Sequence, residues 1–146
     1  MKLTTQLPPG IKLASLSRRA VATILDSIPL GAASIAVALH WGVPGEYEAS
    51  ALPELALLAG IAAYWVFGEG LFGTTFGKLM LDLRVVSVGG ERCTLSQSFK
   101  RNLLRPVDGF FGYLVGFIVA NSVPLRQRLG DLWAGTIVIH QRDRNA

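Results

Sequence analysis

The segment "RRAVATILDSIPL", residues 18–30, decides the fold class of this chain. Two arginines lead into a stretch that is otherwise apolar, and Asp26 lies inside it. A helix that crosses the hydrocarbon core of a bilayer needs about 20 mostly apolar residues. Residues 20–39 meet this requirement with Asp26 as their only charged residue, so they predict a transmembrane helix that carries one carboxylate.

The composition of the whole chain also indicates a membrane protein. Its 146 residues are 51% hydrophobic and only 16% charged, whereas soluble domains usually carry about a quarter charged residues. The net charge of +4 suits the anchoring of helices at a cytoplasmic face. Basic residues are not interleaved with aromatic ones as in proteins that bind single strands. We therefore expect a lipid bilayer as partner and no nucleic acid.

A second apolar segment, residues 55–72, predicts a second transmembrane helix with Glu69 as its only charge. The loop between the two helices, residues 41–54, carries three glutamates and no Lys or Arg. The leader, residues 1–19, and the segment 73–109 are instead rich in Lys and Arg, as cytoplasmic loops are. The two helices are therefore expected to form a hairpin with a cytoplasmic N-terminus. We do not expect the first apolar run to be a cleavable signal peptide, because it is too long and follows a polar stretch of 19 residues.

A third hydrophobic element, residues 107–124, is too short for a simple span. Its uninterrupted apolar part, residues 110–120, would cross about half of the hydrocarbon core. Residues 83–95 predict a β-hairpin with a Gly-Gly turn, and residues 135–140 predict a further strand. Because strands pair only on one side of a membrane, we expect the third element to dip in and return. A short, tilted full span that leaves the tail outside is the alternative.

These elements define the expected fold class. It is an all-α integral membrane protein with two transmembrane helices, a third short or re-entrant hydrophobic element, and a small cytoplasmic β-hairpin or three-stranded element. Residues 1–13 would form a cytoplasmic leader, residues 14–140 the membrane domain, and residues 141–146 a polar tail.

Asp26 needs a partner because an ionisable group inside a membrane span costs several kcal/mol unless it is paired or hydrated. Arg19 lies seven residues earlier, close to two helical turns, and therefore on the same face. Ala22 lies between them and leaves room for a neighbouring helix. Asp26 would either stay protonated or pair with a cytoplasmic cation, acting as a packing clasp or as a proton or ion site. The candidate cations are Lys78, Arg101 and Arg105.

The stretch "GTTFGK", residues 73–78, predicts a tight exit from the second span. It is not a phosphate-binding P-loop, because Leu79 follows the lysine where Ser or Thr is required. We expect Lys78 to extend to the membrane interface. The residues of this cytoplasmic turn motif are Gly73, Thr75, Gly77 and Lys78.

Two further stretches carry clustered charge. The stretch "TLSQSFKRNLLR", residues 94–105, has apolar residues at helical spacing beside Lys100, Arg101 and Arg105. It predicts an amphipathic helix that touches anionic lipid, or an ordinary packed helix with a basic face.

In "LRQRLGDLW", residues 125–133, Arg128 and Asp131 have the spacing of an i,i+3 pair. We expect a charge network that links Asp131 to Arg19 or Arg101. Glu69 could face Asp26 or the interface.

The chain resembles the RDD family of small bacterial and archaeal membrane proteins, which is named for one arginine and two aspartates. The resemblance covers roughly residues 14–140. It rests on four stretches in the family's order: "RRAVATILD" (18–26), "GEGLFGTTFGKLMLDLRVVSVGGE" (68–91), "KRNLLRPVD" (100–108) and "RQRLGDLWAGTIVI" (126–139).

The resemblance implies that Arg19, Asp26 and Asp131 are the signature trio, with Asp108 as a looser match. It implies a multi-pass protein in a prokaryotic cell (inner) membrane. Transport of unknown ligands has been suggested for the family, and some members are described as cation/proton antiporters. This chain departs from the family by Pro106 before Asp108 and by the few polar residues in its spans.

The sequence does not contain a nucleophile–base pair, a metal-ligand cluster or a cofactor fingerprint, so we expect neither an enzyme nor a bound metal or cofactor. Two functions remain. The first is proton-coupled transport of a small solute or ion, and the second is an accessory subunit that packs on a larger membrane complex. In either case the chain is expected to form a homo-oligomer or to join such a complex.

Overall fold

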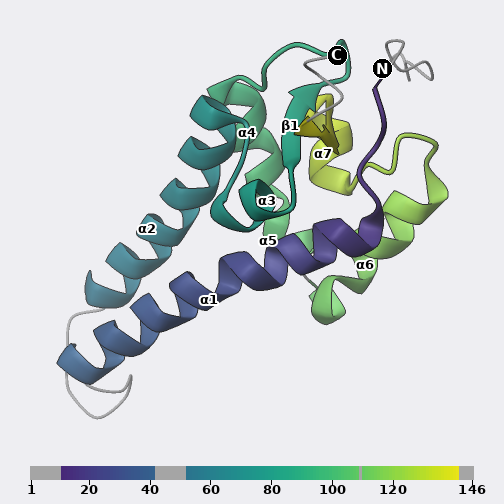
Figure 1. Ribbon diagram of the computed structural model, residues 1–146. Helices are drawn as coiled ribbons and strands as arrows, with labels where there is room; N and C mark the ends of the chain where they lie inside the picture. Colours follow the sequence, from purple (N-terminus) through teal and green to yellow (C-terminus); the bar gives the residue numbers. More distant parts are fainter. Residues whose placement is uncertain (1–10, 42–51, 109, 142–146) are drawn as a thin grey trace.

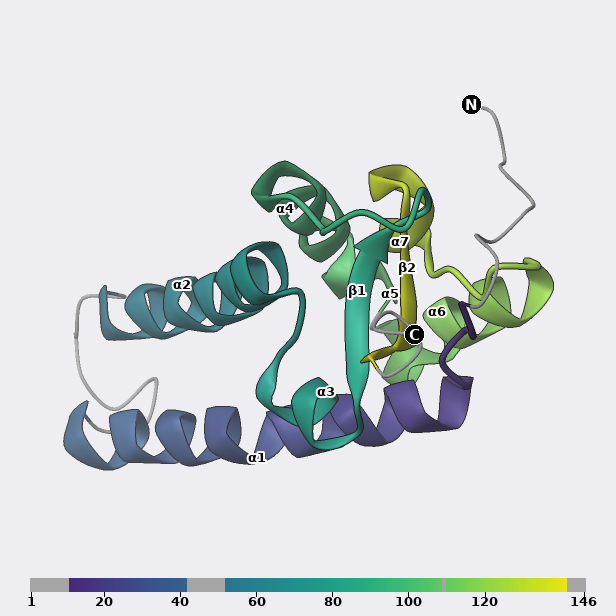
Figure 2. The same ribbon diagram turned by 45° about the horizontal axis from the view of Figure 1, so that its top comes forward.

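The computed structural model describes residues 11–41, 52–108 and 110–141. Most of the predicted leader, acidic loop and polar tail lies outside the described residues. Two long helices dominate the molecule: α1, Leu16–Trp41, and α2, Leu52–Phe67, which continues into a π-helical turn, η1, Gly68–Phe72. The C-terminal end of α1 lies near the N-terminal end of α2, and the two helices diverge toward the other end, where the remaining elements gather (Figures 1 and 2).

Both helices are long and apolar enough to cross a membrane. Only 11% of the most apolar stretch in each is buried inside the protein, whereas the core helix of a soluble protein would be mostly buried. The two predicted transmembrane helices are therefore present as outward-facing elements. The first starts at Leu16 instead of residue 20, and the second reaches Phe72 as expected.

Gly73 ends the second helix, with φ of 71° and a backbone N–H that bonds to the carbonyl of Gly68. This left-handed conformation favours glycine. A short helix, α3, Phe76–Met80, follows and leads into strand β1, Leu83–Ser87. The "GTTFGK" stretch is therefore a tight exit from the hairpin.

The sheet pairs two segments that are far apart in the sequence. Strand β1 runs antiparallel to β2, Thr136–His140, with Leu83 opposite His140. The predicted hairpin is present as a turn after Ser87, but its second strand is a single bridge between Val86 and Arg92. The predicted further strand, β2, is the main partner instead.

Both faces of the sheet are covered, since its residues alternate between two apolar clusters as the period of a strand requires. One cluster joins Leu83, Val85 and Val138 to Ala22 of α1. The other holds Val86, Ile137 and Ile139 against Leu125.

The remaining helices are α4, Leu95–Leu103; α5, Arg105–Asp108; α6, Phe110–Ser122; and α7, Leu129–Ala134. Thr94 and Gln97 form a capping box at the start of α4. Helix α6 lies beside the N-terminal half of α1 (Figures 1 and 2). Its 13 residues extend over about 20 Å, which is less than the roughly 30 Å of a hydrocarbon core.

Helix α3 lies so close to α1 that Gly77 has no room for a side chain. A Cβ atom there would collide with the backbone carbonyl of Ala22, so α3 makes the close approach that Ala22 was expected to allow. We predict that Gly77→Ala lowers the free energy of unfolding in detergent by about 1–3 kcal/mol, because overpacking must push α3 away.

The matched control is Gly31→Ala, since a Cβ at Gly31 meets nothing within 4 Å. Circular dichroism during chemical or thermal unfolding measures both variants. Equal stability of the two would contradict this packing.

Candidate functional site

Charged side chains from α1, η1 and α3–α5 meet those of the α7 region in the interior of the protein. We call this set the charge network. It consists of Arg19, Glu69, Lys78, Arg101, Arg105, Asp108, Arg128 and Asp131.

Asp131 occupies one centre of the network. Its Oδ2 accepts a hydrogen bond from Nη2 of Arg19 at 2.6 Å, and its Oδ1 lies 3.0 Å from Nη2 of Arg101. Arg128 precedes α7 and brings its Nε to 3.8 Å from the same carboxylate. Burial alone would raise the pKa of Asp131, but the three arginines outweigh it and hold this pKa below its usual range.

Glu69 occupies the second centre, at the π-helical turn η1. Its Oε1 pairs with Nζ of Lys78, and its Oε2 lies 3.0 Å from Nε of Arg101. Asn102 donates a hydrogen bond to Oε2 at 3.0 Å, and Nη1 of Arg105 lies 3.9 Å from Oε1. The fully buried Glu69 therefore faces a lysine and two arginines and not Asp26.

Arg101 joins the two centres, because one guanidinium contacts both Glu69 and Asp131. Burial opposes its charged form, yet the two carboxylates outweigh burial and raise the pKa of Arg101. The close approach of α7 to α4 needs Gly130, where a Cβ would collide with the backbone carbonyl of Arg101.

Of the two alternatives for residues 94–105, the buried Arg101 fits the packed helix and not contact with anionic lipid. Helix α4 turns Ser98 and Arg101 inward and leaves Leu95 and Phe99 exposed. The amphipathic pattern is real, but its polar side meets the protein, because two buried carboxylates offer stronger stabilisation than hydrated headgroups.

Lys78 also turns inward, so its predicted extension to the interface is wrong. Its side chain is 5% exposed and pairs with Glu69. Burial and the neighbouring arginines lower the pKa of Lys78 to about 7. Because arginines keep their protons, Lys78 is the cation of this centre that can release one.

Asp26 lies in a separate polar cluster with neutral donors. The hydroxyl of Tyr64 and the N–H of Gly77 both donate to its Oδ1 at 2.7 Å, and the hydroxyl of Thr75 donates to its Oδ2 at 2.7 Å. Of the two alternatives for Asp26, pairing with a cytoplasmic cation is not found, since the ion pairs formed among the described residues do not include Asp26.

Several participants were missed by sequence reasoning. Tyr64 gave a usable signal, because a tyrosine in an apolar span needs a partner for its hydroxyl. Trp65 lies under Arg105, with 3.3 Å between the guanidinium carbon and the ring centroid. Asn102 accepts from Arg105 at 2.6 Å, and nothing in its sequence context indicates this.

Asp108 completes the set at the end of α5. Its side chain is buried and accepts a hydrogen bond from the N–H of Leu129 at 3.2 Å. Burial raises the pKa of Asp108, and the nearby charge of Arg128 lowers it by less, so the pKa stays above its usual value. Within residues 11–41, 52–108 and 110–141, groups of His, Cys, Asp or Glu that could hold a metal ion are not found.

The model of the RDD family matches residues 13–135 of the chain. This chain belongs to the RDD family. The matched residues include Arg19, Asp26 and Asp131. Arg19 pairs directly with Asp131, whereas Asp26, on the same helix α1 as Arg19, lies in a separate polar cluster. No match was found among curated proteins or among solved structures. This RDD protein is a membrane protein with two apolar helices.

We predict that Asp131→Asn destabilises the protein by about 3–5 kcal/mol, because it leaves Arg19 and Arg101 buried with one carboxylate fewer. Glu91→Gln is the control, since Glu91 lies exposed in the turn after β1. Unfolding in detergent and the abundance of each variant in membranes measure the effect. An Asp131→Asn protein as stable as the control would show that the network does not hold the fold together.

The pH dependence of stability tests Lys78. Its pKa of about 7 in the folded protein lies below the ordinary value of about 10.4. The unfolded state therefore binds more protons above pH 7, and the free energy of unfolding rises with pH there, by at most about 1.4 kcal/mol per pH unit. We expect this rise between pH 7 and 8, and we expect Lys78→Met to reduce it. A slope that Lys78→Met leaves unchanged would contradict the assignment.

Proposed function

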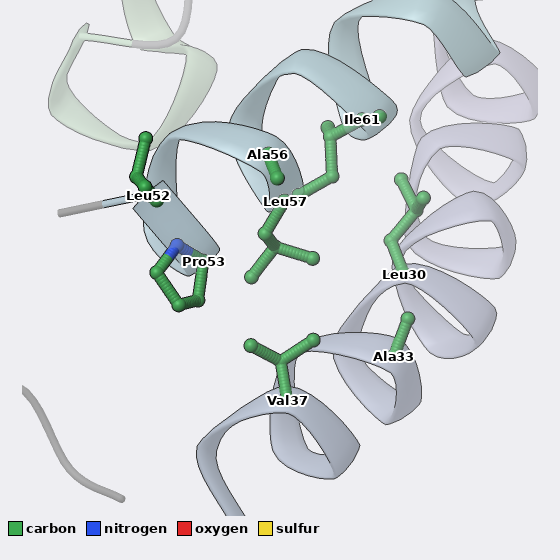
Figure 3. A pocket seen from close by; sticks show the side chains of 9 residues that line it. Leu30, Ala33, Val37, Leu52, Pro53, Ala56, Leu57 and Ile61 are labelled. Atoms are coloured by element: carbon green, nitrogen blue, oxygen red, sulfur yellow. The ribbon is translucent and has the colours of Figure 1, made fainter. Parts of the chain in front are cut away.

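We propose that this RDD protein is an accessory membrane subunit. Its helical hairpin packs against further transmembrane helices, and its charge network fixes the β-element to that hairpin. The observation that carries this proposal is an unfilled apolar groove between α1 and α2, with a volume of about 630 Å³. Leu30, Ala33 and Val37 of α1 face Leu57 and Ile61 of α2 across it (Figure 3).

The groove suits a helix better than a solute. Ala33, Ala56 and Gly60 line it, and such small residues let helix backbones approach closely in a membrane. Between Asp26 and Trp41 in α1 and between Leu52 and Tyr64 in α2, the hairpin has few polar side chains. The hydroxyl of Ser34 is bonded to the carbonyl of Leu30, so it is not a free ligand for a solute.

We place the protein in a prokaryotic cell (inner) membrane with its N-terminus in the cytoplasm. The pairing of β1 with β2 supports a re-entrant course for α6, because the chain between these strands must return to the side on which it started. The exposed Leu114, Phe117 and Ile118 of α6 then face lipid at partial depth.

Proton-coupled transport of a small solute or ion is the second candidate. One observation favours it: Lys78 is buried among charged groups, and its pKa is about 7, so it can exchange a proton near neutral pH. Since two spans do not enclose a path, such a path would lie between protomers.

Site-directed crosslinking in native membranes tests the accessory role. In a background where Cys93 is replaced by serine, Ala33→Cys places a thiol in the groove, and the exposed Ala32→Cys is its neighbouring control. We expect Ala33→Cys to crosslink in high yield to a second copy or to one fixed, stoichiometric subunit, and Ala32→Cys to crosslink less. The mass of the product identifies the occupant.

A purified monomer without crosslinks at either position contradicts the accessory role. Proton flux into liposomes that contain only this chain, lost in Lys78→Met, would support the carrier instead.

A further inference from the structure

A second cavity lies between the N-terminal half of α1 and helix α6. Its volume is about 280 Å³, just below the range of about 300–1,000 Å³ for sites of drug-sized ligands. Its lining is divided by chemistry. It is lined by the basic residues Arg19, Lys78, Arg105 and Arg128 together with the apolar Ile24 and Phe117.

The charges of the network do not balance. The network holds five cations and three carboxylates, so two positive charges are in excess when all are ionised. Arg101 lies between Glu69 and Asp131, and the other four cations line the cavity while they share the same two carboxylates. The network therefore has a net positive charge beside the cavity, and this charge attracts an anion.

Arg128 has hydrogen-bonding capacity left to offer. Its Nε is buried and has no hydrogen-bond partner among the described residues, and its contact with Asp131 is long at 3.8 Å. The planar guanidinium fork matches the oxygens of a phosphate group. Gly116 of α6 lies close to Asp108 and to this side chain, since a Cβ there would be 3.2 Å from Cβ of Asp108 and 3.5 Å from Cδ of Arg128.

The apolar wall determines what else the ligand carries. Ile24 and Phe117 are 64% and 54% exposed, on the outward faces of α1 and α6. In a membrane these side chains meet acyl chains. A ligand that fills the cavity therefore has an anionic head beside a hydrocarbon tail.

We infer that the cavity between α1 and α6 binds the phosphate headgroup of an anionic phospholipid, with its acyl chains along Ile24 and Phe117. The lipid supplies the negative charge that the network lacks and covers the junction of α6 with α1. This inference is independent of the accessory role, because the cavity and the α1–α2 groove have different linings.

Lipid retention by the purified full-length protein tests the site. The protein is exchanged into detergent with equal amounts of phosphatidylglycerol and phosphatidylcholine, and the bound lipid is measured by native mass spectrometry. We expect phosphatidylglycerol to be preferred about tenfold. Arg128→Gln should reduce this preference about tenfold, because it removes the charged hydrogen-bond donor to the phosphate group. Arg18→Gln, an exposed neighbour on α1, should leave the preference unchanged.

Arg128→Gln could lose the lipid because the protein unfolds, so a second pair of variants tests the cavity without changing a charged residue. Ala20 lies exposed at the cavity, so Ala20→Trp should block it and release the lipid, whereas Ala32→Trp, exposed elsewhere on α1, should not. Equal retention of the two lipids, or a preference that survives Ala20→Trp, overturns the inference. Full displacement of the lipid by millimolar inorganic phosphate assigns the site to free phosphate and overturns the lipid assignment.

Discussion

The contact of one guanidinium with two carboxylates is the constraint on which the rest of this structure depends. Arg101 leaves α4 and reaches Glu69 at the end of the hairpin and Asp131 at the start of α7. A buried pair adds little net stability over an apolar one, but a broken pair is costly. The contact therefore fixes the relative positions of α4, η1 and α7, which otherwise share few apolar contacts with the sheet.

The distribution of polarity follows from the same constraint. Large apolar side chains of α3 and α4, such as Phe76, Leu79 and Phe99, are exposed, beside the exposed Lys100 of α4, whereas charged groups fill the interior between these helices. In water this arrangement would be unfavourable, because apolar area would stay hydrated. In a membrane the apolar outer surface contacts lipid, and the buried carboxylates Glu69 and Asp131 have cations as neighbours.

The sequence predicts the hairpin well, because about 20 consecutive apolar residues have few structural solutions. It also predicts a β-element and brings Arg19, Arg101 and Asp131 into one hypothesis. It does not predict which way the side chains of Arg101 and Lys78 point. A basic residue beside leucines can reach either a lipid headgroup or a buried carboxylate, and here both side chains turn inward. It also fails on Asp26, whose partners Tyr64 and Thr75 lie 38 and 49 residues away and carry no charge that marks them.

The charge network and the polar cluster around Asp26 differ in how readily they could move. Asp131 and Glu69 are each held by at least two cations, so displacing either carboxylate would leave several buried charges uncompensated. Asp26 is held by neutral hydroxyls and one amide, and hydroxyl donors can reorient at low cost. The two carboxylates are therefore held rigidly. Motion costs less at Asp26, and at Lys78, because its pKa of about 7 lets it lose its charge near neutral pH.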